Sequence, residues 1–140
     1  MSDGLDTREL EAFAEQLVRV ADENPRRAKR FMQKQGTILK GMTLRTAKQR
    51  VKRKTGNYFN SIKRGKVYTY GGKNIHAIRV FSAAPHAHLI EDGHRVFSYG
   101  QGSGFAPGKH VFSDARKDFQ GKFETASEDF LDEMIREAEQ

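Results

Sequence analysis

Residues 24–90 contain seventeen lysines and arginines and no aspartate or glutamate, which restricts how this chain can fold. The segments on either side are acidic: residues 1–23 hold seven acids and two bases, and residues 91–140 hold eleven acids and six bases. The acidic ends can lie against the basic middle and neutralise part of its charge. Because they are too few to neutralise all of it, the sequence also predicts a surface that binds polyanions or acidic protein surfaces.

The length of 140 residues predicts a single domain over residues 1–140. Hydrophobic residues make up 36% of the chain, which is enough for one modest core. No stretch approaches the roughly 18–20 uninterrupted apolar residues of a membrane span. The acidic N-terminal segment does not predict a secretory signal. Without cysteine there is no disulfide scaffold and no thiolate metal site, so we expect a protein that tolerates a reducing cytoplasm.

Apolar residues at helical spacing predict three main helices, over residues 7–22, 25–54 and from 113 to the C-terminus. Asp6 and Ser113 are the expected caps of the first and last, and Pro25 suits the first position of the second. Gly36 and Gly41 lie inside the long second helix, where each costs about 1 kcal/mol relative to alanine. We therefore expect a kink or break between these two glycines.

The predicted second helix carries twelve basic residues, and none of them has an acidic residue four positions further along the chain. They are Arg26, Arg27, Lys29, Arg30, Lys34, Lys40, Arg45, Lys48, Arg50, Lys52, Arg53 and Lys54. We interpret them as a surface that faces either the phosphates of DNA or an acidic partner, and the simplest alternative is a solvated helix face. Any contact with DNA would be electrostatic, because no sequence-specific binding motif is present.

The segments between the long helices predict a small antiparallel sheet. Residues 67–70 and 75–81 are β-branched and aromatic runs around a glycine-containing turn, which is typical of a hairpin. Short helical segments are expected at 55–62, capped by Thr55, and at 85–92, ended by Gly93. A strand at 96–99, a glycine-rich loop at 100–108 and a strand at 110–112 complete the pattern. The sequence thus predicts an α+β fold, with a long basic second helix and a C-terminal helix packed on a small antiparallel β-sheet.

His86, His88 and Glu91 form the best candidate metal site and with it the hypothesis of a metal-dependent enzyme. Residues i and i+2 diverge by about 200° on a helix, so the expected helix at 85–92 separates the two histidines. Surface or interface histidines are therefore favoured, and no metal or cofactor is predicted. The glycine-rich segment lacks the Lys-Ser or Lys-Thr of a phosphate loop, and a mobile loop at a protein contact is favoured instead. No nucleophile–base motif is present, so we expect no catalytic residues and no enzyme activity.

Three blocks of the sequence are similar to those of a small tail-component family of tailed bacteriophages, the head–tail joining, neck or tail-completion proteins. They are Thr55-Gly-Asn-Tyr-Phe-Asn-Ser-Ile62, Ala84-Pro-His-Ala-His-Leu-Ile-Glu91-Asp-Gly93-His94 and Pro107-Gly-Lys-His-Val-Phe112 followed by Ala115. The chain departs from the family pattern at His86 and His94, which replace the usual tyrosine and threonine. The resemblance covers about residues 5–138.

The resemblance implies a structural virion protein whose copies form part of a ring in the neck between the DNA-filled head and the tail. The partners would be further copies, neighbouring connector and tail proteins and, less directly, packaged DNA. The protein would lie in the virion, and in the host cytoplasm during assembly; an isolated copy can remain monomeric. The residues carried over as structural are Thr55, Gly56, Asn57, Ser61, Ile62, Glu91, Gly93 and Pro107.

For two of these residues the sequence predicts a specific role. Gly56 is expected where a side chain would clash or where φ is positive. Glu91 is expected either to cap nearby amides or to pair with a base across a subunit boundary. The main alternative to the structural role is a non-specific nucleic-acid-binding protein that uses the helix at 25–54.

Overall fold

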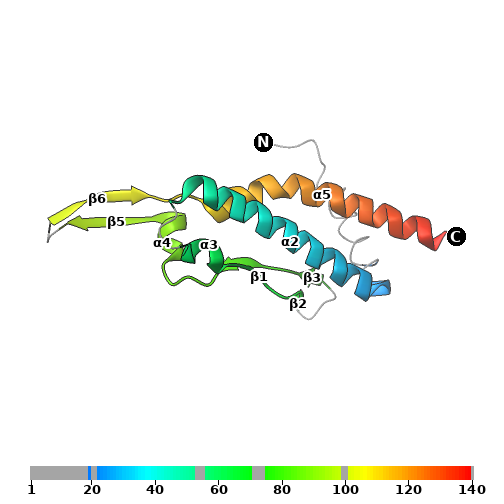
Figure 1. The fold of residues 1–140 in the computed structure, drawn as a ribbon. Helices are drawn as coiled ribbons and strands as arrows, with labels where there is room; N and C mark the ends of the chain where they lie inside the picture. Colours follow the sequence, from blue (N-terminus) through cyan, green and yellow to red (C-terminus); the bar gives the residue numbers. More distant parts are fainter. Residues whose placement is uncertain (1–18, 20–21, 53–55, 71–74, 99–100, 140) are drawn as a thin grey trace.

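The computed structural model describes residues 19, 22–52, 56–70, 75–98 and 101–139, and it places two long helices side by side above short β-ribbons (Figure 1). Of the helix predicted at 7–22, only positions 19 and 22 are described, and both are helical, as is Glu23; the rest of the predicted helix lies outside the described residues. The elements in chain order are α2 (Pro25–Arg50), α3 (Asn57–Ser61), β1 (Ile62–Arg64), β2 (Tyr68–Tyr70), β3 (Ile75–Ala77), β4 (Val80–Ser82), α4 (Ala87–Asp92), β5 (Gly93–Ser98), β6 (Gln101–Pro107) and α5 (Val111–Ala138). The predicted α+β fold class is confirmed. Within the described residues no helix has the length and apolarity needed to cross a bilayer.

Helix α2 is continuous over 26 residues, so a break between Gly36 and Gly41, one of the two forms of the prediction, is wrong. Gly36 is buried, and a Cβ on it would lie 2.5 Å from Cδ1 of Ile78. The missing side chain therefore lets the β-ribbon approach the helix closely, and this packing offsets the intrinsic cost of glycine. The helix ends at Arg50 rather than at residue 54, because Val51 adopts an extended conformation (φ −111°, ψ 126°).

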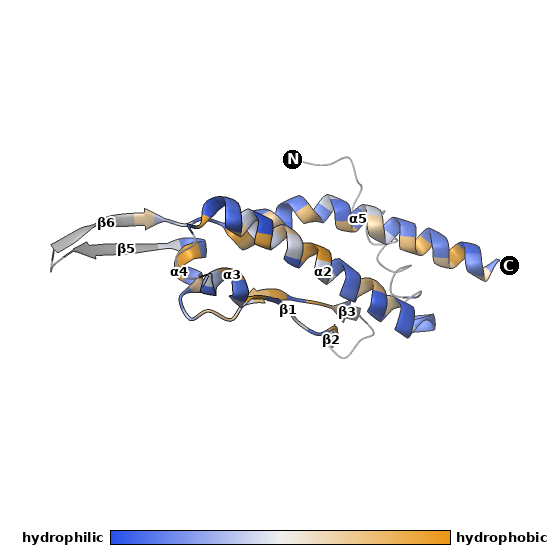
Figure 2. Ribbon diagram, in the orientation of Figure 1, coloured by the Kyte–Doolittle hydropathy of each residue, from blue (hydrophilic) through white to orange (hydrophobic). Residues whose placement is uncertain are grey.

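Aromatic rings form the contact between α2 and α5. The ring of Phe31 stacks on that of Phe130 at 4.5 Å between centroids and lies 6.2 Å from that of Phe123. Phe119 is buried, and the centroid of its ring lies 5.8 Å from that of the Phe123 ring. The predicted stripe of α5 is thus confirmed over most of its length, although Ile135 is 42% exposed. In Figure 2 both long helices alternate hydrophilic and hydrophobic segments, as amphipathic helices do.

The described strands form three separate antiparallel pairs: β1 with β4, β2 with β3, and β5 with β6. The predicted hairpin at 67–81 is present as β2 and β3, with Tyr68 opposite Ala77. Its second strand is split, because residues 80–82 form β4 and pair with β1 instead, with Ile62 opposite Ser82. Strand β1 was not predicted, since three residues after a helical turn leave no periodic signal.

Strands β5 and β6 form a hairpin that extends away from the two long helices (Figure 1). The prediction of a glycine-rich loop at 100–108 is wrong, because residues 101–107 are paired with β5. The predicted strand at 110–112 is also wrong. His110 has a positive φ of 50° and Val111 begins α5, two residues before the predicted cap.

The centre of the core lies where α2, β1 and the start of α5 meet. Ala47, Ile62 and Val111 are at most 2% exposed, and half-buried apolar side chains pack against them. The short helix α4 connects this core to the β5–β6 hairpin. It begins two residues later than predicted, and Gly93 ends it as predicted.

Candidate functional site

Glu91 caps helix α5 from a distant part of the chain. Its Oε1 accepts a hydrogen bond from the amide of Phe112 at 2.8 Å, and its Oε2 accepts one from the amide of Ser113 at 2.9 Å. These amides belong to the first turn of α5, which has no partner for them within the helix and carries partial positive charge. Of the two roles considered for Glu91, the structure therefore shows the capping one, within a single chain. Ser113, predicted as the cap, is instead a residue whose amide is capped.

The segment before α5 is held against the end of α4 by backbone contacts. The amide of Lys109 donates to the carbonyl of Ile90 at 2.7 Å, and that of His110 donates to the carbonyl of Glu91 at 3.2 Å. Gly108 approaches so closely that a Cβ on it would lie 2.3 Å from the Glu91 carbonyl oxygen. Gly93 ends α4 with φ 94° and ψ 170°, a conformation open to glycine. Pro107, the last residue of β6, is exposed beside this junction.

Two of the twelve predicted basic residues are engaged within the chain by α5. Nη1 of Arg50 donates to the carbonyls of Lys109 (2.9 Å) and His110 (3.3 Å) and to Oδ2 of Asp114 (2.5 Å). The hydrogen bond from Arg50 lowers the pKa of the Asp114 carboxyl. Arg27 forms ion pairs with Glu133, at 3.1 Å, and with Glu137. Part of the basic middle is therefore neutralised by the acidic C-terminal helix, as one interpretation of the charge pattern predicted.

Six other basic residues are exposed along α2 and just beyond its end, and we call them the outer basic face. The five that lie on α2 are three, four or eleven residues apart, which places them on one broad side of the helix, and the sixth follows the extended Val51. They are Arg26, Arg30, Lys34, Arg45, Lys48 and Lys52, and all are exposed. Lys29 is exposed beside this strip, and Lys40 is half-buried. Arg53, Lys54 and Thr55 lie outside the described residues.

The block at 56–62 forms the corner between α2 and the β-ribbons. Gly56 is buried and precedes α3 in the left-handed conformation (φ 81°, ψ −2°). Asn57, the first residue of α3, is exposed. The Ser61 hydroxyl lies 2.6 Å from that of Ser82 and donates to the Tyr58 carbonyl, and Ile62 enters the core. These residues therefore support the fold locally.

Replacing Gly56 with valine is expected to lower the free energy of unfolding by about 2 kcal/mol. A β-branched residue is strained in the left-handed region that Gly56 adopts, whatever the space around it. Chemical denaturation followed by circular dichroism measures the change. Gly41→Ala is a suitable control, because that glycine is exposed in α2 and a Cβ there meets nothing within 4 Å. A Gly56→Val variant as stable as the wild type would contradict the structural role of this residue.

The Tyr58 hydroxyl is buried with no hydrogen-bond partner among the described residues. Burial, reinforced by the negative charge of Glu91, raises the pKa of Tyr58 to about 12 from the usual 10.0. Between these two values the folded state keeps a proton that the unfolded state has lost, so stability falls as the pH rises through this window.

We expect Tyr58→Phe to lose less stability than the wild type as the pH rises from about 10 to about 12. At neutral pH the variant should be at least as stable, because no hydrogen bond is removed. Denaturant unfolding at both ends of the window measures this, and Tyr68→Phe, at a tyrosine that is 42% exposed, is the matched control. Identical pH dependence in the wild type and both variants would contradict the assignment.

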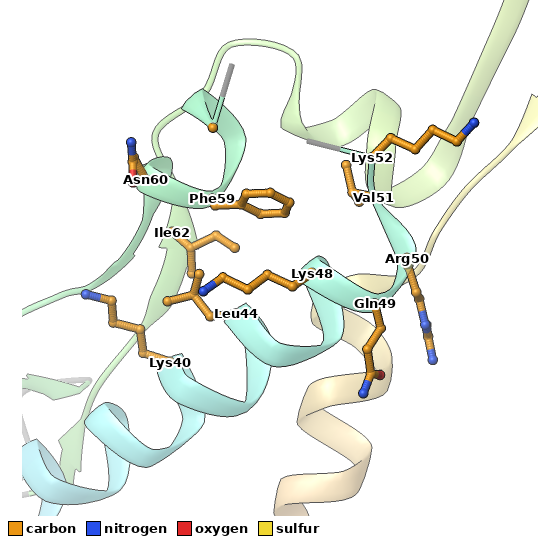
Figure 3. A pocket seen from close by; sticks show the side chains of 11 residues that line it. Lys40, Leu44, Lys48, Gln49, Arg50, Val51, Lys52, Phe59, Asn60 and Ile62 are labelled. Atoms are coloured by element: carbon orange, nitrogen blue, oxygen red, sulfur yellow. The ribbon is translucent and has the colours of Figure 1, made fainter. Parts of the chain in front are cut away.

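A groove between the C-terminal part of α2 and α3 was not predicted from the sequence. It has a volume of about 920 Å³. Its apolar lining comes from Leu44, Val51, Phe59 and Ile62, whose side chains gather around the hollow in Figure 3. Four basic residues, Lys40, Lys48, Arg50 and Lys52, also line it; in Figure 3 the ends of the Arg50 and Lys52 side chains extend away from the hollow. The alternation of apolar and basic residues between positions 40 and 52 is the sequence signal that could have indicated this groove.

The histidines do not form a metal site in the part of the chain that is described. His86 precedes α4 and His88 lies on it, and both are exposed. Both carboxylate oxygens of Glu91 already accept hydrogen bonds. His94 lies on β5. The described residues contain no group of three or more histidines, cysteines or acids that could hold a metal ion.

Comparison with known proteins relates the chain to a protein family. The model of a protein family described as "Bacteriophage HK97-gp10, putative tail-component" matches residues 11–93. The match includes α2, α3, α4 and strands β1 to β4, and ends at the first residue of β5. It is thus shorter than the resemblance inferred from the sequence, and the block at Pro107 lies beyond it. The comparisons with curated proteins and with solved structures each gave no match.

Proposed function

Because the chain belongs to the HK97-gp10-like family of bacteriophage tail components, we propose that it is a structural protein of the neck, where its copies form part of the ring that joins the DNA-filled head to the tail. The observation that carries this proposal is the family match over 11–93, more than half of the chain. The family supports a structural role in the virion. The proposed joining role requires no catalysis, metal or cofactor.

The distribution of charge supports assembly through protein contacts. The outer basic face is left uncovered by α5, which neutralises only Arg27 and Arg50 in the ion pairs of the described residues. Residues 124–139 of α5 hold seven acids and one base. Two different, complementary surfaces on one chain favour head-to-tail contacts, which close into rings when the rotation between copies allows it. Neighbouring connector and tail proteins are the other proposed partners.

The outer basic face also supports a second candidate function, non-specific binding of nucleic acid. Each phosphate contact contributes about 0.9 to the slope of log affinity against log salt concentration, so several bases in a strip would give a steep dependence. Arg50 cannot be counted among them, because it is engaged with α5. In the neck, this face would contact either passing DNA or an acidic partner.

One variant separates the two candidates. Arg26, Arg30 and Lys34 are replaced together by glutamine, and the control variant carries glutamine at Arg116, Lys117 and Lys122, three exposed bases of α5. Both variants lose the same charge and are expected to fold. If the chain is a connector that uses this face, only the first variant fails to restore infectivity to phage that lack the chain, while binding of free DNA changes equally in both.

A nucleic-acid-binding protein gives the reverse result. The first variant then loses affinity for free DNA with a smaller salt slope, and the infectivity of the particles is unaffected by either variant. If phage that lack the chain are fully infectious, the connector proposal is wrong.

A further inference from the structure

We propose that the groove between α2 and α3 receives the acidic, C-terminal part of α5 from a second copy of this chain. This inference rests on the proposed ring and specifies the two surfaces that would form its repeated contact.

The apolar side chains that line the groove are only partly covered within a single chain. Leu44, Val51 and Phe59 are only half-buried, although they pack against the core residue Ile62. Lysines also line the groove, and no acidic residue is among the described residues that line it. A ligand that matches it therefore presents an apolar side chain flanked by carboxylates.

Helix α5 presents such a pattern on an exposed face, whose Ile135 borders a small pocket that Arg19 and Glu23 also line. Glu124, Glu128, Asp132, Ile135 and Glu139 lie on one face by their helical spacing, and all are exposed. Ile135 is the one large apolar side chain exposed on α5, at 42%. An isoleucine between carboxylates has the chemistry that the lysine-lined groove requires.

The two surfaces lie at opposite ends of the molecule, so they cannot meet within one chain. Arg27, near the start of α2, pairs with Glu133 and Glu137 of α5. The groove begins at Lys40, which is about 20 Å further along α2 at 1.5 Å per residue. In Figure 1, α3 lies towards the hairpin end of α2, whereas the C-terminus of α5 lies at the far end. A contact between them must join different copies, and its head-to-tail repetition builds a ring when the rotation between copies closes.

Disulfide cross-linking tests this contact, because the wild-type chain has no cysteine. The test chain carries Lys48→Cys and Ile135→Cys, both at exposed positions. The control chain carries Lys34→Cys and Ile135→Cys; Lys34 is an exposed lysine of the same helix, about 21 Å before Lys48 and not among the residues lining the groove. Each chain is oxidised in concentrated solution and in purified particles, and the products are separated on a non-reducing gel.

The expected result is a ladder of covalent multimers from the test chain that is at least ten times more intense than that from the control chain. Ladders of equal intensity, or none from the test chain in either preparation, would overturn the proposed contact. A cross-link from the introduced cysteine at position 48 to another particle protein would also overturn it, in favour of a neighbouring tail protein. If the particles contain the chain and no ladder forms, only this inference fails; if they do not contain the chain, the proposed function fails.

Discussion

Replacement of Glu91 by lysine is expected to lower the free energy of unfolding by about 3–5 kcal/mol. The variant loses two hydrogen bonds between a carboxylate and the first amides of α5, each worth about 1.5–3 kcal/mol. It also places a cation at the positive end of a 28-residue helix. Because both effects act within one chain, we expect the loss in the isolated monomer. Urea unfolding followed by circular dichroism measures it.

Two further variants define the cause. Asp92→Lys makes the same charge change at the adjacent, exposed residue and should alter stability by no more than about 0.5 kcal/mol. Glu91→Gln keeps one acceptor oxygen without the charge and should fall between the wild type and Glu91→Lys. If Glu91→Lys instead unfolded like Asp92→Lys and failed only in assembly, the pairing of Glu91 across a subunit boundary would be the correct interpretation.

Gly108→Ala is the second substitution for which we expect a large loss, about 3 kcal/mol. An alanine Cβ would lie 2.3 Å from the Glu91 carbonyl oxygen and 2.7 Å from the carbonyl carbon of Asp92. These are backbone atoms of α4, so relief of the clash must move the same segment that holds the Glu91 carboxylate against α5. Thermal unfolding of the variant gives the size of the effect.

Gly121→Ala is the matched control for Gly108→Ala. Gly121 is exposed in α5 and a Cβ there meets nothing within 4 Å, so this variant should gain up to about 1 kcal/mol. Combining Gly108→Ala with Glu91→Lys should cost less than the sum of the two, because both disturb one junction. Equal stability of Gly108→Ala and the wild type would show that this junction is looser than the structure indicates.

The sequence predicted the elements that depend on local patterns. The apolar stripe of α5 and the stop at Gly93 were correct, because helical periodicity and positive-φ glycines leave signals within a few residues. The start of α5 was misplaced because its cap is Glu91, about twenty residues earlier in the chain. The glycines at 102 and 104 lower strand propensity, yet pairing with β5 makes their segment a strand.

The candidate site was only partly predictable for a similar reason. The twelve bases were recognised, but their partners were not. Arg27 meets Glu137 across 110 positions, and Arg50 meets Asp114 across 64. Such pairs form when α2 and α5 pack together, and a single sequence contains no local signal for them. The groove likewise arises from the turn that folds α3 back towards α2 after Val51.

The central claim is that this tail-component family member joins head to tail, and locating the chain in the virion tests it most directly. The measurement is electron microscopy of particles that carry an N-terminally labelled chain, together with particles assembled without the chain. We expect the label in a ring at the junction of head and tail, and separate DNA-filled heads and tails when the chain is missing. A label found elsewhere in the particle, or heads and tails that join normally without the chain, would contradict the proposed function.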